Sequence, residues 1–386
     1  MNRAHEISRR MFVADLSATA IALPVFGKVD ADGRPVLLNE ARKKRALGQF
    51  FTEGHCWLRP QIIDFIRTSR CSVVYDPFAG NGCLFAPVTN AIPGITRVVG
   101  LDIDASLGWQ VNDSLLNIPT VRDAIIVTNP PYISNYSASR KRLGKDLEKY
   151  FAVTPYDDVY LLALDRMLTA QKNVVAIIPE TFINSSYRRK QLLHSLTVLE
   201  QNPFLDTDAP VVVACFDSIP KAYADIKVYK DAEFICTVAD IEACRMSPMN
   251  AISMRFNDPD GWLGVRCVDT TKPDDGLRFD FKERIDYNWE RGIKASSRLL
   301  TLISIDVPTG RRQSLVDACN EILRDLRVRS HDLVFSPFKG NMKNGVRRRR
   351  LDFQTCRAIV ERAYAQVFGD LRADGMLQTS LFMEAI

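Results

Sequence analysis

The stretch SVVYDPFAGNG, residues 72–82, decides the fold that we expect for this chain. It opens with an apolar run, Ser72–Tyr75, and passes directly into an acidic, glycine-rich turn, Asp76–Gly82. Such a turn after a buried strand lets the backbone approach a ligand closely and presents free amides. It lacks the Lys-Ser/Thr pair of a P-loop and the GxGxxG spacing, so nucleotide phosphate is not its predicted ligand.

The chain around this stretch alternates between helical and strand patterns. Leu58–Ser69 has helical spacing before it. Further short apolar runs bounded by turn residues follow it, at Arg97–Leu101, Ala124–Thr128, Val174–Ile178 and Val211–Phe216. Continuous Val/Ile-rich runs are typical of strands buried on both faces, which occur in parallel sheets covered by helices. The pattern therefore predicts an α/β domain with a doubly wound, mainly parallel sheet of the Rossmann-like type.

Polar residues stand where these predicted strands end. Asp102 closes the second run, Asp113 follows shortly after it, and Asn129 follows the third. Ligands in doubly wound sheets lie beyond the carboxyl ends of the strands, so we expect these groups in one crevice. The acidic start of the glycine turn suits a cationic ligand, and the two carboxylates suit hydroxyls and an amino group. S-adenosylmethionine carries all of these groups, and we predict it as the cofactor.

The most specific motif is Asn129-Pro130-Pro131-Tyr132, which begins 53 residues after Asp76. Two consecutive prolines make a rigid loop with few backbone donors, which leaves carbonyl acceptors beside an amide side chain and an aromatic ring. An acceptor pair next to a stacking ring matches a planar group that bears an exocyclic amine.

In combination these motifs resemble the S-adenosylmethionine-dependent DNA adenine-N6 methyltransferases of the gamma class, over residues 46–216. The resemblance includes the N-terminal cofactor motif at Gly48–Thr52, although Glu53 stands where proline is usual. It implies the class I methyltransferase fold. It also implies that Asp102 binds the ribose hydroxyls and Asp113 the adenine amine of the cofactor. The cofactor-binding residues that it implies are Phe51, Thr52, Asp76, Phe78, Gly80, Gly82, Asp102, Ile103, Asp113 and Pro131.

The same resemblance implies the catalytic residues and the order of events. The catalytic set is Asn129, Pro130, Tyr132 and Phe204, with Phe204 preceding the last core strand and holding the target base. The Asn129 oxygen and the Pro130 carbonyl would accept the N6 hydrogens of an adenine that has left the duplex. The amine then attacks the sulfonium methyl in line. No large insertion separates Asp113 from Asn129, which assigns the gamma class.

Beyond residue 217 the alternation fades and basic residues accumulate. Helical patterns recur at Ser314–Arg327 and Thr355–Phe368, which predicts an α+β domain over residues 217–386. Residues 291–362 hold 16 lysines and arginines against 7 aspartates and glutamates, a footprint for a polyanion. We predict this domain to recognise double-stranded DNA. The predicted phosphate-binding residues are Lys339, Lys343, Arg347, Arg348, Arg349 and Arg350.

Residues 1–45 are predicted to form an N-terminal helical arm. Ser8–Phe12 resembles a twin-arginine export signal, but Asp15 interrupts the apolar region that such a signal needs. The expected organisation is thus an arm at 1–45, a catalytic methyltransferase domain at 46–216 and a target-recognition domain at 217–386.

Composition limits the other classes of protein. With 46% hydrophobic and 25% charged residues the chain is expected to be an ordinary soluble protein, without an apolar run long enough for a membrane span. Its nine cysteines form no CxxC pair and its four histidines no HxxxH spacing, so neither a disulfide framework nor a metal site is predicted. We expect a cytoplasmic monomer.

The predicted function is site-specific DNA adenine-N6 methylation, as the modification component of a restriction-modification system. A cognate restriction endonuclease that acts separately is the candidate partner. Protein-glutamine and RNA N-methyltransferases remain alternatives, because they use the same NPPY chemistry on an amide or base nitrogen. A non-catalytic nucleic-acid-binding module is a further alternative, against which the intact motifs argue.

Overall fold

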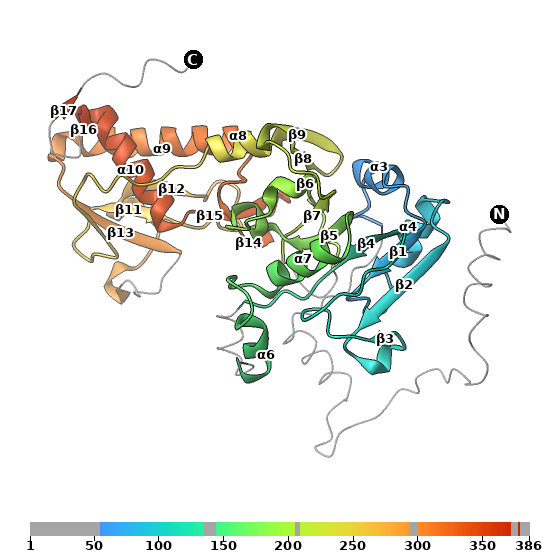
Figure 1. The fold of residues 1–386 in the computed structure, drawn as a ribbon. Coiled ribbons are helices and arrows are strands. Elements are labelled where there is room, and N and C mark those ends of the chain that lie inside the picture. Colours follow the sequence, from blue (N-terminus) through green and yellow to red (C-terminus); the bar gives the residue numbers. More distant parts are fainter. Residues whose placement is uncertain (1–54, 135–143, 205–208, 293–298, 372–376, 379–386) are drawn as a thin grey trace. The chain divides into compact units, whose positions relative to one another are not determined.

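The computed structural model describes residues 55–134, 144–204, 209–292, 299–371 and 377–378 (Figure 1). The predicted arm at 1–45 and the motif at Gly48–Thr52 lie outside these residues. The chain divides into two compact units, one of residues 1–176 with 203–207 and the other of residues 177–202 with 208–386. The functional boundary at residue 217 stays a prediction.

The first unit alternates strands and helices, as the apolar runs predict. Its elements are α3 (Pro60–Thr68), β1 (Val73–Asp76), α4 (Phe85–Ala91), β2 (Arg97–Asp102), β3 (Gln110–Val111), β4 (Ala124–Thr128), α6 (Gly144–Phe151), α7 (Val159–Ala170) and the start of β5 (Val174–Pro179). The strand order is β3-β2-β1-β4-β5, and every neighbouring pair runs parallel. This is the order of a Rossmann-like half, and it confirms the predicted doubly wound α/β fold.

Burial explains why these strands form where they do. All residues of β1 and all of β4 are buried, so each needs an uninterrupted apolar run rather than an alternating one. Helix α7 is buried at nine of its twelve positions, including Tyr160, Leu164 and Met167. The helix is therefore apolar on nearly all sides, in contrast to α3, which buries only the face formed by Ile62, Phe65 and Ile66.

The second unit contains the end of β5 and two further layers of structure. Its first elements are β6 (Leu193–Val198), β7 (Val211–Phe216), β8 (Lys227–Lys230), β9 (Glu233–Thr237) and α8 (Val238–Ala243). They follow the order β5-β7-β6-β8-β9, in which β7 is antiparallel to β6 and β8 is parallel to β6. Residues 227–237 thus continue a sheet, whereas the sequence showed no alternation after residue 217.

The remainder of this unit is an α+β layer, which confirms the predicted architecture. Its elements are β10 (Met254–Phe256), β11 (Leu263–Arg266), β12 (Arg278–Phe281), β13 (Leu300–Ile305), α9 (Arg312–Arg329), β14 (Ser336–Asn341), β15 (Arg347–Arg350), α10 (Phe353–Phe368), β16 (Asp370–Leu371) and β17 (Leu377–Gln378). Strands β10-β13-β11-β12 form an antiparallel sheet, and α9 packs against β12 and α10.

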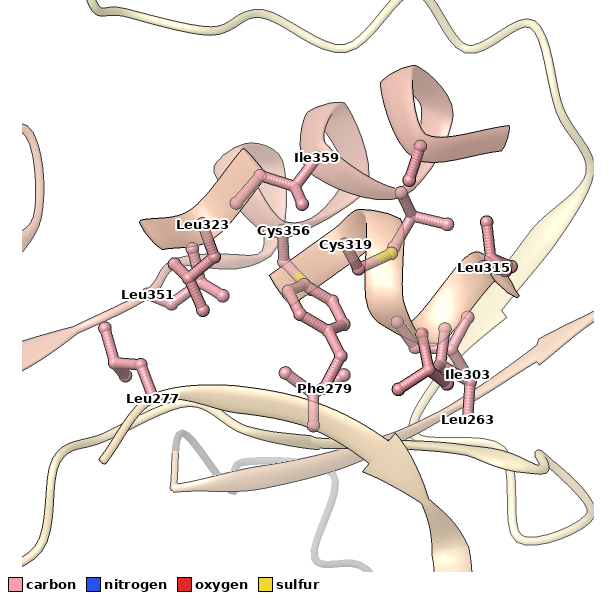
Figure 2. Packing of buried hydrophobic residues seen from close by; sticks show 14 of the residues in the cluster. Leu263, Leu277, Phe279, Ile303, Leu315, Cys319, Leu323, Leu351, Cys356 and Ile359 are labelled. Carbon is pink, nitrogen blue, oxygen red and sulfur yellow. The ribbon is translucent and has the colours of Figure 1, made fainter. Parts of the chain in front are cut away.

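The core of this layer lies between the sheet and the two long helices. Figure 2 shows the Phe279 side chain of β12 pointing toward Cys319 of α9 and Cys356 of α10. Both cysteines are fully buried, and burial raises the pKa of each thiol above its ordinary value. Their role here is that of small apolar side chains.

Candidate active site

The glycine-rich turn after β1 has the conformation that its sequence predicts. Gly80 and Gly82 both have positive φ, at 54° and 75°. Trp109 packs on this turn and donates from Nε1 to the Gly80 carbonyl at 2.8 Å. A Cβ at Gly82 would lie 2.9 Å from the Trp109 ring, and one at Gly100 only 2.5 Å from it. The turn therefore needs glycine for its backbone conformation and for the approach of this ring.

Two buried carboxylates hold the turn in place. Asp76 accepts from the Phe78 amide at 2.9 Å and from Thr128 Oγ1 at 2.5 Å, both through Oδ1. Asp102 accepts from the Gly80 amide at 2.9 Å through Oδ2 and from the Asp104 amide at 2.9 Å through Oδ1. Asp102 thus bridges the glycine-rich turn after β1 and the end of β2.

Asp76 has an unusual protonation equilibrium. Burial, assisted by the nearby Asp102 charge, raises the pKa of Asp76 to about 7, while the bonds from Thr128 and Phe78 act in the opposite direction. The protonated form of Asp76 therefore stabilises the fold. This contribution is complete below the unfolded pKa near 3.8 and is lost as the pH rises through about 7.

Asp76→Asn tests this assignment, because the amide oxygen can accept both hydrogen bonds without carrying a charge. We expect the variant to unfold at a higher temperature than the wild type at pH 8 and at nearly the same temperature at pH 4. The difference at pH 8 should correspond to a few kcal/mol, on the order of 1.4 kcal/mol per pKa unit. Asp64→Asn on the exposed face of α3 is the matched control. Parallel melting curves for Asp76→Asn and wild type across this range would contradict the assignment.

A pocket of about 560 Å³ opens beside the turn at the carboxyl ends of the strands. The predicted cofactor-binding residues that line it are Phe78, Asp102, Ile103, Asp113 and Pro131. Ile103 is 53% exposed and offers an apolar surface at the pocket for a flat ligand. Asp76, Gly80 and Gly82 shape the turn and do not line the pocket. Phe51 and Thr52 lie outside the described residues.

Several pocket residues were not identified from the sequence. They are Ser114, Leu115, Ile133, Leu147, Lys149, Tyr150 and Val159. Lys149 and Tyr150 come from α6 and reach Asp113 from 36 and 37 positions further along the chain. No spacing rule relates them to Asp113. The packing of Trp109 on the glycine-rich turn was also not predicted. The sequence signal for it is Gly100 inside β2, because a glycine within a strand often marks the close approach of another group.

The Asn129–Tyr132 loop begins directly after β4 and borders this pocket through Pro131. Tyr132 Oη donates a hydrogen bond to Asn129 Oδ1. Burial raises the pKa of Tyr132 well above 10, so its hydroxyl keeps the proton that it donates. The Asn129 oxygen is held in one orientation as a result.

Aromatic rings surround the loop. The Tyr132 ring lies 6.2 Å from that of Phe204 at an interplanar angle of 64°, and 6.5 Å from that of Tyr160 at 83°. Phe204 is buried, with 5% of its surface exposed. The structure therefore brings together Asn129, Tyr132 and Phe204, three of the four predicted catalytic residues, and Pro130 is buried between the first two.

The predicted DNA-binding residues lie on the hairpin of β14 and β15 in the second unit. Lys339 and Lys343 are exposed. Arg348 donates from Nε to the Asp269 carbonyl at 2.7 Å and covers the Phe338 ring at 4.8 Å. Arg350 is half-buried.

Arg347 and Arg349 do not form the solvated basic face that a run of four arginines suggests. Arg349 is 5% exposed and pairs with Glu180, which is 1% exposed. Arg347 lies 3.6 Å from the other oxygen of Glu180 and donates to the Leu199 carbonyl at 2.7 Å. The alternating geometry of β15 places both on its inner face. Their first role is to hold the hairpin against the segment after β5, and contact of the run with phosphates stays a prediction.

Among the described residues no group of three histidine, cysteine, aspartate or glutamate side chains is placed to hold a metal ion. None of the helices in the described ranges combines the length and apolar character that a membrane span needs.

Neither a protein-family profile nor a curated protein matches the chain. Among solved structures, it is similar to a type I restriction-modification methyltransferase subunit from Streptococcus thermophilus, at 16% identity, a TM-score of 0.35 and coverage of 51% of this chain and 53% of that one. It is also similar to a modification subunit of a putative type I restriction enzyme from Vibrio vulnificus, at 14% identity and a TM-score of 0.33, with coverage of 50% of each chain. A third similar structure is the M protein of the type I restriction enzyme EcoKI, at 12% identity and a TM-score of 0.33, with coverage of 78% of this chain and 75% of that one. The chain spans about half the length of the first two.

Likeness at this level concerns the fold alone, and the fold assignment rests on the strand order of this chain. Its chemistry has to be argued from its own residues.

Proposed function

We propose that this chain is an S-adenosylmethionine-dependent DNA methyltransferase that modifies N6 of adenine. The observation that supports this most directly is Pro131, which lines the same pocket as Asp102 and Asp113 and is also part of the Asn129–Tyr132 loop. A small molecule bound in the pocket and a substrate amine bound at the loop would therefore both lie next to Pro131. The same geometry serves any methyl transfer between a pocket-bound donor and an amine at the loop, and we propose adenine N6 on the resemblance of the motifs to the gamma class.

The pocket fits the cofactor in size and in chemistry. Its volume lies within the range of about 300–1,000 Å³ that small-molecule sites occupy. Asp102 offers acceptor oxygens for hydroxyls, Asp113 an acceptor for an amine, and Ile103 an apolar surface for a ring. When bound, S-adenosylmethionine supplies an electrophilic methyl group. The residues of this chain bind it, orient it and present the amine.

The catalytic loop acts on the electronics of the amine. Adenine N6 is a poor nucleophile because its lone pair is delocalised into the ring. Acceptance of its two hydrogens by the Asn129 oxygen and the Pro130 carbonyl favours a pyramidal nitrogen and directs the lone pair toward the pocket. Catalysis then consists of positioning and of stabilising developing positive charge, without a strong general base. The new ammonium is acidic enough to release its proton to water.

The target adenine has to leave the duplex, at a cost of a few kcal/mol. Stacking on aromatic rings offsets this by about 1–3 kcal/mol per base, and Tyr132 and Phe204 are the rings at the loop. We further propose that the chain acts as a monomer and is the modification component of a restriction-modification system, separate from a cognate endonuclease.

Methyl-labelled cofactor tests the substrate class. The purified chain is incubated with duplex DNA, with RNA and with protein in separate reactions, and the labelled product is identified by nucleoside or peptide analysis. We expect the label in duplex DNA as N6-methyladenine. Label in RNA or on a glutamine instead would replace the DNA substrate by one of the alternatives, and label in none would overturn the proposed function.

The two exposed lysines of the hairpin test where DNA affinity originates. Each phosphate contact steepens the dependence of log affinity on log salt by about 0.9 for duplex DNA. Replacing Lys339 and Lys343 by serine should therefore flatten that slope by up to about 2, with the preferred sequence unchanged. Lys227→Ser, at an exposed lysine of β8 outside the hairpin, is the control. Fluorescence anisotropy at several salt concentrations gives the slopes, and an unchanged slope would remove the hairpin lysines from the interface.

A further inference from the structure

Two side chains of α6 share one oxygen of Asp113. Lys149 Nζ donates to Asp113 Oδ2 at 2.9 Å, and Tyr150 Oη donates to the same oxygen at 3.0 Å. The Lys149 ammonium also lies 4.6 Å from the centre of the Tyr150 ring. All three residues line the 560 Å³ pocket. One end of this pocket is therefore made of a carboxylate with two donors on one of its oxygens.

This arrangement leaves the second oxygen of Asp113 as its remaining acceptor. Within the described part of the chain, no hydrogen bond to Oδ1 is formed, and the Asp113 side chain is 23% exposed. Two donors on Oδ2 restrict rotation of the carboxylate, because turning it would break both bonds. The pocket thus receives an oriented carboxylate oxygen that can accept a hydrogen bond.

We propose that Lys149 and Tyr150 are positioning residues that make the pocket selective for a 6-aminopurine over a 6-oxopurine. This inference rests on the proposed function, since it takes Asp113 to face the purine ring of the cofactor. An oriented carboxylate oxygen accepts from an exocyclic N–H and repels an exocyclic carbonyl oxygen. The two donors bind Oδ2 of Asp113 and thereby orient Oδ1, the oxygen that decides between the two purines.

The charge on Lys149 persists over the working range of an assay. Its hydrogen bond to Asp113, with a smaller contribution from Tyr150, raises the pKa of this already basic ammonium. Both donors are therefore present at neutral pH.

Calorimetry with two product analogues tests the inference without catalysis. The probes are S-adenosylhomocysteine and S-inosylhomocysteine, which differ in the amine or carbonyl at position 6 of the purine. The full-length chain is compared with Lys149→Met, Tyr150→Phe, the double variant and Lys149→Arg, which keeps a cationic donor. Lys172→Met, an exposed lysine of the same unit that does not line the pocket, is the matched control.

We expect the double variant to lose about tenfold of the wild-type preference for the amine, with each single variant between it and the wild type. Lys149→Arg should retain most of the preference, and Lys172→Met all of it. An unchanged ratio of the two dissociation constants in the double variant would overturn the inference. If both ligands bound more weakly by the same factor, the ratio would also be unchanged, and α6 would then support only the shape of the pocket.

Failure of the proposed function has a different signature. A wild-type chain that binds neither analogue would overturn the cofactor assignment itself, and the inference with it. Binding of S-adenosylhomocysteine with the expected ratios, but without methylation of DNA, would support the role of Lys149 and Tyr150 and overturn only the proposed substrate.

Discussion

Asn129→Ala is expected to reduce methyl transfer to adenine by about 10²- to 10³-fold, the loss that follows removal of one group that acts mainly in the transition state. Its oxygen is the proposed side-chain acceptor for the substrate amine and accepts a hydrogen bond from the Tyr132 hydroxyl. Cofactor affinity should be unchanged, since Asn129 does not line the pocket. Single-turnover assays with labelled cofactor give the transfer rate, and calorimetry with S-adenosylhomocysteine gives the affinity.

Two matched variants separate the chemistry from the fold. Tyr132→Phe keeps the aromatic ring and removes the donor to Asn129, so we expect a smaller loss of about tenfold. Asn90→Ala changes an exposed asparagine of the α4 helix in the same unit and should behave as the wild type. Turnover by Asn129→Ala near that of Asn90→Ala would show that the loop does not perform the proposed chemistry.

Arg349→Met is expected to destabilise the chain by about 3–5 kcal/mol, the usual loss when one partner of a buried ion pair is removed. Glu180 would stay at 1% exposure, and its ion-pair partner among the described residues would then be Arg347, at 3.6 Å. The Arg349 main-chain amide bonds separately to Asp269 at 2.8 Å, so the strand itself need not be lost. Urea unfolding of the full-length chain measures the change in the free energy of unfolding.

Arg329→Met is the control, because Arg329 is 62% exposed and forms a surface ion pair with Asp325 on the same helix. A change within about 0.5 kcal/mol is expected there. The double variant Glu180→Gln/Arg349→Met should lose less than the sum of its single variants, since neither charge then stays buried alone. Equal stability of Arg349→Met and Arg329→Met would mean that the buried pair does not hold the hairpin. If our expectation is met, replacing all four arginines would mainly unfold this region and could not be interpreted as loss of DNA contacts.

The apolar runs determined the central strands closely. Ala124–Thr128 and Val211–Phe216 form strands with the predicted bounds. A strand buried on both faces has to be apolar at each position, and that requirement is visible locally in the sequence. The strands within residues 227–237 were not predicted. Strands β8 and β9 lie toward the edge of their sheet and have exposed, charged positions such as Lys227 and Glu233, so they do not form a continuous apolar run.

The sequence by itself also determined that Asp102, Asp113 and Pro131 would share a crevice, because parallel strands bring their carboxyl ends to one edge of a sheet. Only the tertiary structure decided which donors meet a given carboxylate. Lys149 reaches Asp113 across 36 positions and Arg349 reaches Glu180 across 169. An arginine run looks alike in sequence whether its side chains are solvated or paired. The strand that carries it, and the acid buried beneath it, decide between the two, and neither is encoded within the run.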